Sequence, residues 1–242
     1  MPNIKLGLLG ANGKMGNTVQ RLLKDDGSNI SLFAQADLGD PLEPLLTSDV
    51  IIDFSSPTAT LELIRKCLSL QSQKLPTLVV GSTGWKIADL KELESLSKKT
   101  IVFISSNFSL GVMVFLEILK FAQPILKKLK YTPVIIEKHH RHKKDAPSGT
   151  AVSIQKIVSS PGSDAFSNIQ THSVRAGEIV GDHEVGFYGL YDQLIFSHHA
   201  KDRAIFGRGA LEVALWLAEK RALKPSLTGL FEMGHFFKEK LK

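Results

Sequence analysis

The sequence predicts an α/β protein whose two parts are built differently. In the first hundred residues, short apolar segments rich in β-branched residues alternate with segments of helical spacing, which is typical of βαβ units and a parallel sheet. After about residue 107 this alternation stops. One long apolar helical segment then precedes several strand-like segments, which indicates an α+β arrangement.

The first part is expected to contain five strands with helices between them. The predicted strands cover residues 4–9, 30–34, 50–54, 77–80 and 101–104. Apolar residues spaced three and four apart predict helices over 15–23, 61–68 and 90–96. Crossovers between parallel strands are right-handed, so a ligand crevice is expected at the carboxyl ends of the strands.

The second part is expected to form an open mixed sheet with helices. A long helix over 112–129 is followed by a strand over 133–136 and by a helix that starts near Pro147. Residues 168–199 predict several strands, broken by Gly177, Gly181, Gly186 and Gly189.

A last apolar helix, over 210–217, is expected to return to the first part. The expected domains are therefore 1–107 together with 208–242, and 108–207.

Composition excludes several classes of protein. The 242 residues are 43% hydrophobic and 22% charged, unlike a collagen, a coiled coil or a disordered chain. The single cysteine, Cys67, excludes an internal disulfide, and its apolar neighbours at helical spacing predict a buried thiol. No stretch suits a membrane span or a secretory signal, so a cytoplasmic protein is expected. The net charge of +6 suits anionic ligands without indicating nucleic acid.

A glycine-rich turn between the first strand and the first helix predicts a nucleotide site. Its residues are Gly10, Ala11, Asn12, Gly13, Lys14, Met15 and Gly16. Glycines at such a turn let the backbone approach a pyrophosphate, and the helix N-terminus offers N–H groups to the phosphates. The spacing differs from the standard dinucleotide fingerprint, so on its own the motif equally suits a plain turn.

An acidic residue after the second strand strengthens this interpretation. Asp37 follows Gly16 by 21 residues, a distance at which a carboxylate can bind the ribose hydroxyls. Leu38 stands where an arginine would suit a 2′-phosphate, so NADH is favoured, although Lys14 leaves NADPH open. Without the glycines, Asp37 would equally suit a solvated turn.

Two further strand ends carry small or hydrogen-bonding residues. Gly81, Ser82 and Thr83 follow one strand, and Ser105, Ser106, Asn107 and Phe108 follow the next. Such residues also favour plain turns, but both groups fall at the edge where a nicotinamide and its ribose are expected.

Residues 137–150 contain the densest group of charged and titratable side chains in the sequence. Three histidines occur within residues 139–142, and Lys143 and Lys144 follow them. The next residues resemble a helix start, at which Asp145 or Ser148 can cap and Pro147 suits the first turn. Backbone N–H groups there, beside lysine and histidine, predict a carboxylate receptor next to proton donors.

Two other interpretations of this segment are less favoured. A zinc site would need a further ligand at the usual spacing, and His139 and His140 point to opposite faces of an extended strand, so no metal is expected. A phosphate-binding patch for nucleic acid would contain fewer histidines. We expect neither nucleic acid nor a membrane as a partner.

The same segment resembles the signature of 4-hydroxy-tetrahydrodipicolinate reductase, also called dihydrodipicolinate reductase. The signature covers residues 139–143 and 145–151, and the resemblance extends over nearly the whole chain. It includes residues 10–16, 53–55, 81–84, 106–109, 175–181 and 208–211.

The resemblance implies a Rossmann dinucleotide-binding domain, a substrate and tetramerisation domain, and a homotetramer. It also implies reduction of (2S,4S)-4-hydroxy-2,3,4,5-tetrahydrodipicolinate, a dicarboxylate, with NADH or NADPH in lysine and diaminopimelate biosynthesis. His139 would exchange a proton and Lys143 would donate one. His140, Ser148, Gly149 and Thr150 would bind substrate. The cofactor would contact residues 10–15, Asp37, residues 81–83 and residues 105–108.

Three features depart from the family pattern. The chain is shorter than typical members between the second strand and Val50, Leu38 replaces an arginine that many members carry, and residues 220–228 resemble an insertion without an assigned role. The roles of Lys138 and His142 also stay open. Two other functions remain: another Rossmann oxidoreductase without a dicarboxylate site, and a nucleotide-sensing or nucleic-acid-binding module.

Overall fold

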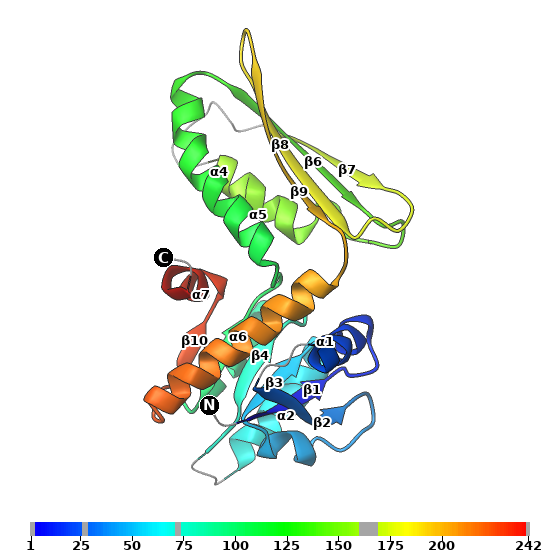
Figure 1. Cartoon of the computed structure of the whole chain (residues 1–242), viewed down its shortest axis with the longest axis vertical. Coiled ribbons are helices and arrows are strands. Elements are labelled where there is room, and N and C mark those ends of the chain that lie inside the picture. The colour runs from blue at the N-terminus through cyan, green and yellow to red at the C-terminus, as the bar shows by residue number, and fades with distance from the viewer. Residues whose placement is uncertain (1–2, 26–28, 71–73, 160–168, 241–242) are drawn as a thin grey trace. The chain divides into compact units, whose positions relative to one another are not determined.

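The computed structural model describes residues 3–25, 29–70, 74–159 and 169–240, and it divides the chain into two compact units (Figure 1). The first unit comprises Met1–Phe108 and Ala204–Lys242. The second comprises Ser109–Arg203. Among the described residues, no helix is both long and apolar enough to cross a membrane.

A parallel sheet of six strands forms the centre of the first unit. In chain order the strands are β1 (Ile4–Leu9), β2 (Ile30–Ala36), β3 (Val50–Asp53), β4 (Thr77–Val80), β5 (Ile101–Ile104) and β10 (Gly229–Phe231). Their order across the sheet is β10-β5-β4-β3-β1-β2, and every pairing is parallel. The α/β prediction with a parallel sheet is confirmed, and β10 is a strand that the sequence did not indicate.

Helices pack against this sheet. They are α1 (Lys14–Asp25), the 3-10 helix η1 (Glu43–Thr47), α2 (Pro57–Ser69), α3 (Ile87–Ser97), α6 (Ala204–Leu223) and α7 (Met233–Lys240). Helix α6 packs on α1, β3 and β4, and α2 packs on α3. The central strands β3, β4 and β5 are buried on both faces, which suits their almost continuously apolar sequences.

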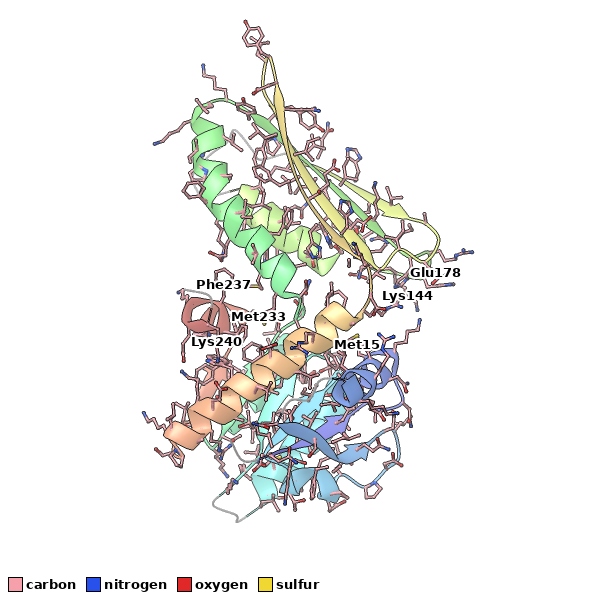
Figure 2. All side chains as sticks on the ribbon, in the orientation of Figure 1. Met15, Lys144, Glu178, Met233, Phe237 and Lys240 are labelled. Carbon is pink, nitrogen blue, oxygen red and sulfur yellow. The ribbon has the colours of Figure 1, made fainter. Side chains whose placement is uncertain are left out.

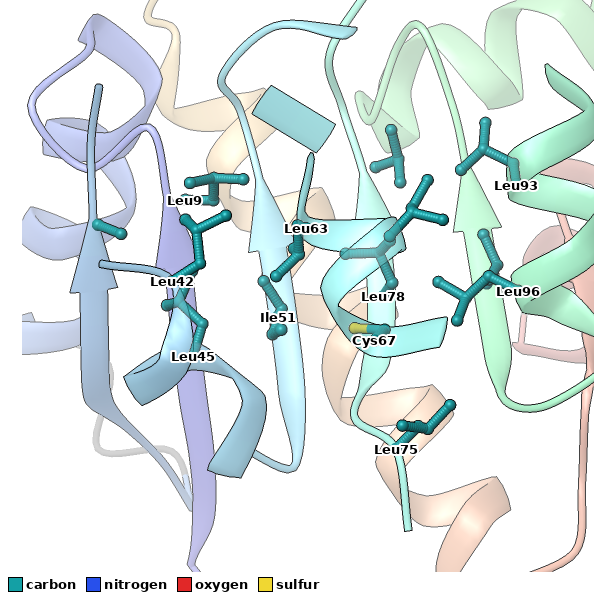
Figure 3. Close-up of a cluster of buried hydrophobic side chains, with 14 residues drawn as sticks. Leu9, Leu42, Leu45, Ile51, Leu63, Cys67, Leu75, Leu78, Leu93 and Leu96 are labelled. Carbon is teal, nitrogen blue, oxygen red and sulfur yellow. The ribbon is translucent and has the colours of Figure 1, made fainter. Parts of the chain in front are cut away.

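One hydrophobic cluster holds η1, α2 and α3 on the sheet (Figure 3). Ile51 and Leu78 contribute from the strands and Leu63 from α2. Cys67 lies in the same cluster as a buried free thiol, as predicted, and burial raises its pKa to about 11. At that pKa the thiol is protonated at neutral pH and acts as a small apolar side chain.

The second unit is a four-stranded mixed sheet with two helices. The strands are β6 (Thr132–His139), β7 (Gln170–Arg175), β8 (Gly181–Tyr188) and β9 (Gln193–Ala200), in the order β7-β6-β8-β9. β6 pairs with β7 in parallel, and the other pairings are antiparallel. Helices α4 (Leu110–Lys128) and α5 (Gly149–Val158) cover one face of this sheet (Figure 1).

Alternation along β6 separates a helix-facing side from an open side. Ile135, Glu137 and His139 are buried, whereas the residues between them are half-buried. Ile135 joins Phe115 of α4 and Ile154 of α5 in the core of this unit. The period of two therefore places Glu137 and His139 on the helix-covered face.

Two of the predicted strand breaks are wrong. Gly181 and Gly186 lie within β8, and only Gly177 and Gly189 lie outside the strands. The glycines leave room for rings: a Cβ on Gly181 would lie 3.0 Å from Nε2 of His139, and one on Gly186 would lie 2.7 Å from the Tyr188 ring. A glycine inside a strand can thus indicate close approach of a neighbouring side chain.

Candidate active site

The glycine-rich turn of the first unit is shaped by close backbone contacts. Gly10 has a φ of +81°, a conformation that favours glycine, and a Cβ there would lie 2.9 Å from the backbone of Phe54. Gly16 lies in α1, and a Cβ would lie 2.2 Å from the carbonyl oxygen of Gly10. Helix α1 therefore begins directly on the loop, with its N-terminus beside the carboxyl end of β1, as a pyrophosphate site requires.

Asp37 connects the end of β2 to this turn. One carboxylate oxygen accepts a hydrogen bond from the backbone N–H of Asn12 at 2.7 Å, and the other accepts from the N–H of Leu38 at 2.8 Å. The carboxylate thus lies at the carboxyl edge, where ribose hydroxyls are expected. Leu38 itself is 96% exposed.

The other two loops also lie at the carboxyl edge, directly after β4 and β5. Ser82 is 5% exposed and its hydroxyl lies 3.0 Å from that of Thr60, whereas Thr83 is exposed. Phe108 is buried against Phe54 and Phe103, so its ring is a core side chain of this unit. The structure thus places all the predicted cofactor residues at one edge of one sheet.

A buried carboxylate lies beneath these loops. Asp53 is fully buried at the end of β3 and bonds to the backbone and hydroxyl of Ser55 and to the hydroxyl of Thr60. Burial raises the pKa of Asp53 against the effect of these hydrogen bonds. Thr60 contacts both Asp53 and Ser82, so the network fixes the loop after β4.

In the second unit, His139 ends β6 and is 8% exposed. Its Nδ1 bonds to the carboxylate of Glu137, which is fully buried. Arg175 of β7 donates to the same carboxylate at 2.6 Å. Burial lowers the pKa of His139 below its usual value, and Glu137 opposes that effect. Glu137 therefore fixes the His139 ring through Nδ1, and burial and Glu137 together set the pKa of this histidine.

Lys143 and Ser148 lie on the loop between His139 and α5. The Lys143 ammonium is 2.8 Å from Asp145. Ser148, not Asp145, is the N-cap of α5: its hydroxyl accepts from the N–H of Ala151 at 3.2 Å. Pro147 lies before the cap and not in the first turn, which corrects the predicted helix start. Gly149 opens the helix, and Thr150 follows it.

His183 of β8 completes this group. Its Nε2 lies 3.2 Å from the hydroxyl of Ser148, and its ring meets that of His139 edge-to-face at 5.2 Å between centroids. Burial lowers the pKa of His183 to about 4, so this imidazole is neutral at neutral pH. The predicted residues of this unit thus gather between the end of β6 and the start of α5, where they bring together helix N–H groups, a lysine and a histidine, and His183 adds a second imidazole.

Sequence reasoning assigned no role to Glu137, Arg175 or His183. The signal for Glu137 is present, because a residue two positions before His139 shares its face of a strand. Ligand atoms of Glu137, His139 and His183 lie within 4.8 Å of one another, a spacing that could suit a metal. The Arg175 guanidinium on the same carboxylate disfavours a cation there.

Sequence comparisons identify the family. The chain matches the descriptions "Dihydrodipicolinate reductase, N-terminus" over residues 4–108 and "Dihydrodipicolinate reductase, C-terminus" over residues 111–236. A 4-hydroxy-tetrahydrodipicolinate reductase of Campylobacter jejuni serotype O:6 is 37% identical, over 90% of this chain and 95% of its own. One of Wigglesworthia glossinidia brevipalpis is 31% identical, over 99% and 95%.

Solved structures agree on the fold. A dipicolinate-bound dihydrodipicolinate reductase from Paenisporosarcina sp. TG-14 matches with a TM-score of 0.70 and 22% identity, over 96% of this chain and 98% of its own. A probable dehydrogenase from Thermotoga maritima matches with a TM-score of 0.59 and 13% identity, over 94% and 91%. With both family descriptions and relatives above 30% identity over most of its length, the chain belongs to the 4-hydroxy-tetrahydrodipicolinate reductase family, NAD(P)-binding oxidoreductases of lysine and diaminopimelate biosynthesis.

Proposed function

We propose that this chain reduces (2S,4S)-4-hydroxy-2,3,4,5-tetrahydrodipicolinate to (S)-2,3,4,5-tetrahydrodipicolinate, preferring NADH. The reaction consumes one hydride and one proton and releases one water. The proposal rests on the group formed by His139, Lys143 and the N-terminus of α5 in the second unit, in a chain that belongs to this reductase family. The names of the relatives support the same reaction.

The first unit fits a dinucleotide. The absent side chains of Gly10 and Gly16 let α1 begin directly at the carboxyl end of β1, so that its N-terminal N–H groups lie where a pyrophosphate would bind. Asp37 lies where ribose hydroxyls would bind. When bound, the reduced nicotinamide supplies the hydride. The residues after β4 and β5 would hold its ribose and ring at the carboxyl edge. Asp37 would repel a 2′-phosphate and Leu38 offers it no charge, which supports NADH.

The second unit fits a dicarboxylate. His140, Ser148, Gly149 and Thr150 would bind the carboxylates, which the positive end of the α5 dipole also attracts. Lys143 would leave Asp145 and place its ammonium at the ring nitrogen, where it donates a proton as hydride adds. His139 would take a ring proton and return it to the leaving 4-hydroxyl, which departs as water, so the net uptake is the one proton from Lys143. Charge that develops on the substrate during reduction would be stabilised by the Lys143 ammonium and the N-terminus of α5.

Turnover of a freshly made substrate tests the proposal. The condensation product of aspartate semialdehyde and pyruvate is supplied with NADH and NADPH in parallel, and loss of reduced-nicotinamide absorbance is followed. We expect turnover with both and a higher kcat/KM with NADH. A protein that binds NADH but reduces nothing would contradict the substrate assignment.

The Lys143→Ala variant tests the proton donor. We expect kcat to fall by about 100-fold or more, because general acid catalysis contributes factors of that size, with NADH affinity unchanged. Lys144→Ala is the matched control, because Lys144 is the adjacent, exposed lysine (Figure 2). An unchanged kcat in Lys143→Ala would remove Lys143 from the mechanism.

We also propose a homotetramer and a cytoplasmic location. The face of the second unit's sheet that α4 and α5 do not cover carries exposed apolar side chains, among them Val174 and Ile195. Exposed apolar side chains on an uncovered sheet face are typical of contacts between subunits.

A further inference from the structure

The carboxylate beside His139 is buried and held by two partners. Glu137 is fully buried on β6, and its oxygens bond to Nδ1 of His139 and to Nη2 of Arg175. A buried carboxylate is strongly unfavourable unless it is paired and hydrogen-bonded. Burial acts to raise the pKa of Glu137, but the bonds to Arg175, Ser173 and His139 outweigh burial and lower it. Glu137 is therefore ionised and can only accept hydrogen bonds.

This pairing dictates where His139 carries its proton. Since Glu137 only accepts, Nδ1 of His139 must donate, and Nε2 of the neutral ring is then the free base. Nε2 faces Gly181, where a Cβ would lie only 3.0 Å away. The missing side chain keeps that side of the ring from being crowded.

Arg175 also holds the loop that carries Lys143. Its Nη2 donates to the backbone carbonyl of Asp145 at 2.7 Å, in addition to Glu137 at 2.6 Å. The carboxylate of Asp145 in turn bonds to Lys143. One guanidinium thus connects the partner of His139 with the partner of Lys143, across a parallel strand pairing.

We propose that Glu137, fixed by Arg175, is a positioning residue that keeps the proton of His139 on Nδ1 so that Nε2 exchanges the catalytic proton. The assignment of that exchange to His139 rests on the proposed function. The tautomer itself does not rest on it. The charged and titratable groups around His139 are Glu137, Lys143, Arg175 and His183.

The tautomer is measured first, on the unmodified protein. Nitrogen-15 NMR of histidine-labelled protein, with His139 assigned from the spectrum of His139→Gln, distinguishes a protonated Nδ1 from a protonated Nε2. We expect Nδ1 to be protonated and Nε2 to be bare in the neutral ring. A neutral ring with its proton on Nε2 would overturn the proposal, whatever reaction the protein catalyses.

The Glu137→Gln variant then removes the charge but keeps the shape. We expect kcat to fall by about 10- to 100-fold, as for other carboxylates that orient a histidine, with KM and NADH affinity nearly unchanged. Glu137 raises the pKa of His139, so the limb of the pH profile that follows His139 should move to lower pH. If kcat falls in Glu137→Gln while its pH limb and its His139 tautomer stay the same as in the unmodified protein, the role of Glu137 is merely structural. That result would contradict the proposal.

Controls separate this result from loss of fold. Glu178→Gln should leave kcat and the pH profile unchanged, because Glu178 is exposed on the loop after β7 (Figure 2). Arg175→Lys keeps a cation near Glu137 and should retain more activity than Arg175→Met. If Glu137→Gln does not fold, Arg175→Lys and Arg175→Met test whether Glu137 must be fixed to control the His139 tautomer. The same pH limb and the same tautomer in both variants would contradict the proposal. No turnover by the unmodified protein would refute the proposed function and leave the tautomer result standing.

Discussion

The second buried histidine, His183, predicts how the second unit responds to acid. Burial lowers its pKa from 6.5 to about 4, so below pH 6.5 the unfolded chain binds a proton that the folded protein does not. Stability from the neutral ring is complete above pH 6.5 and is lost as the pH falls from there towards 4. We expect a slope from this group of at most about 1.4 kcal/mol per pH unit in that window.

His183→Gln measures this contribution. Urea unfolding at several pH values can be followed by tyrosine absorbance, since Tyr131, Tyr188 and Tyr191 all lie in the second unit. The variant should lose stability less steeply between pH 6.5 and 4 than the unmodified protein. Identical slopes would mean that His183 does not carry the acid sensitivity.

Asp37 is the residue at which cofactor choice can be changed. Asp37→Asn keeps one side-chain oxygen, which can accept from Asn12 or from Leu38, and removes the charge. We expect NADH affinity to fall by about 10-fold, as for the loss of a charged hydrogen bond. NADPH affinity should stay the same or rise, because the variant has no negative charge at residue 37 to repel the 2′-phosphate. Fluorescence titration of both cofactors checks this, and an unchanged ratio of affinities would remove Asp37 from discrimination.

At the scale of the element, α1 can lie on the glycine turn only because Gly16 has no side chain. The blocking atom is the backbone oxygen of Gly10, which cannot move aside as a flexible side chain could. We expect Gly16→Ala to destabilise the first unit by about 2–3 kcal/mol through overpacking, and to weaken NADH binding. Urea unfolding followed by the fluorescence of Trp85 and Trp216 reports on this unit alone, because both lie in it.

Gly234→Ala is the control for helix propensity. Gly234 lies in α7, and a Cβ there would meet nothing within 4 Å. Alanine favours a helix by up to about 1 kcal/mol over glycine, so this variant should be as stable as the unmodified protein or more so. Equal losses in the two glycine variants would contradict the packing argument.

The elements also show how far the sequence could be interpreted without a structure. β1, β4 and β5 have the bounds that their apolar segments predict, since local composition decides strands covered on both faces. β6 was predicted to end at residue 136 and continues to His139, because Glu137 and His139 find partners on neighbouring strands. Arg175 lies 38 residues from Glu137, a pairing that no local pattern encodes. The histidine-rich segment could therefore be recognised from sequence, but not the contacts that fix its proton.

At the scale of the whole molecule, the open face of the second unit's sheet predicts self-association. Helices α4 and α5 cover the opposite face, while Val174, Tyr188 and Ile195 remain 38–48% exposed. Val134 and Ile136 of β6 are half-buried on the same side by the alternation of the strand. A two-fold contact would bury this surface against its own copy, which is how closed oligomers usually form.

Ile195→Lys tests this surface. Four copies of the chain should sediment together in the unmodified protein, and the lysine should shift the population to smaller species at the same concentration, because it places a charge in an apolar contact. Ile87→Lys is the matched control, since Ile87 is 86% exposed on α3 in the first unit. Sedimentation velocity distinguishes the species. A tetramer that tolerates Ile195→Lys would place the contact elsewhere, and a monomeric unmodified protein would refute the tetramer itself.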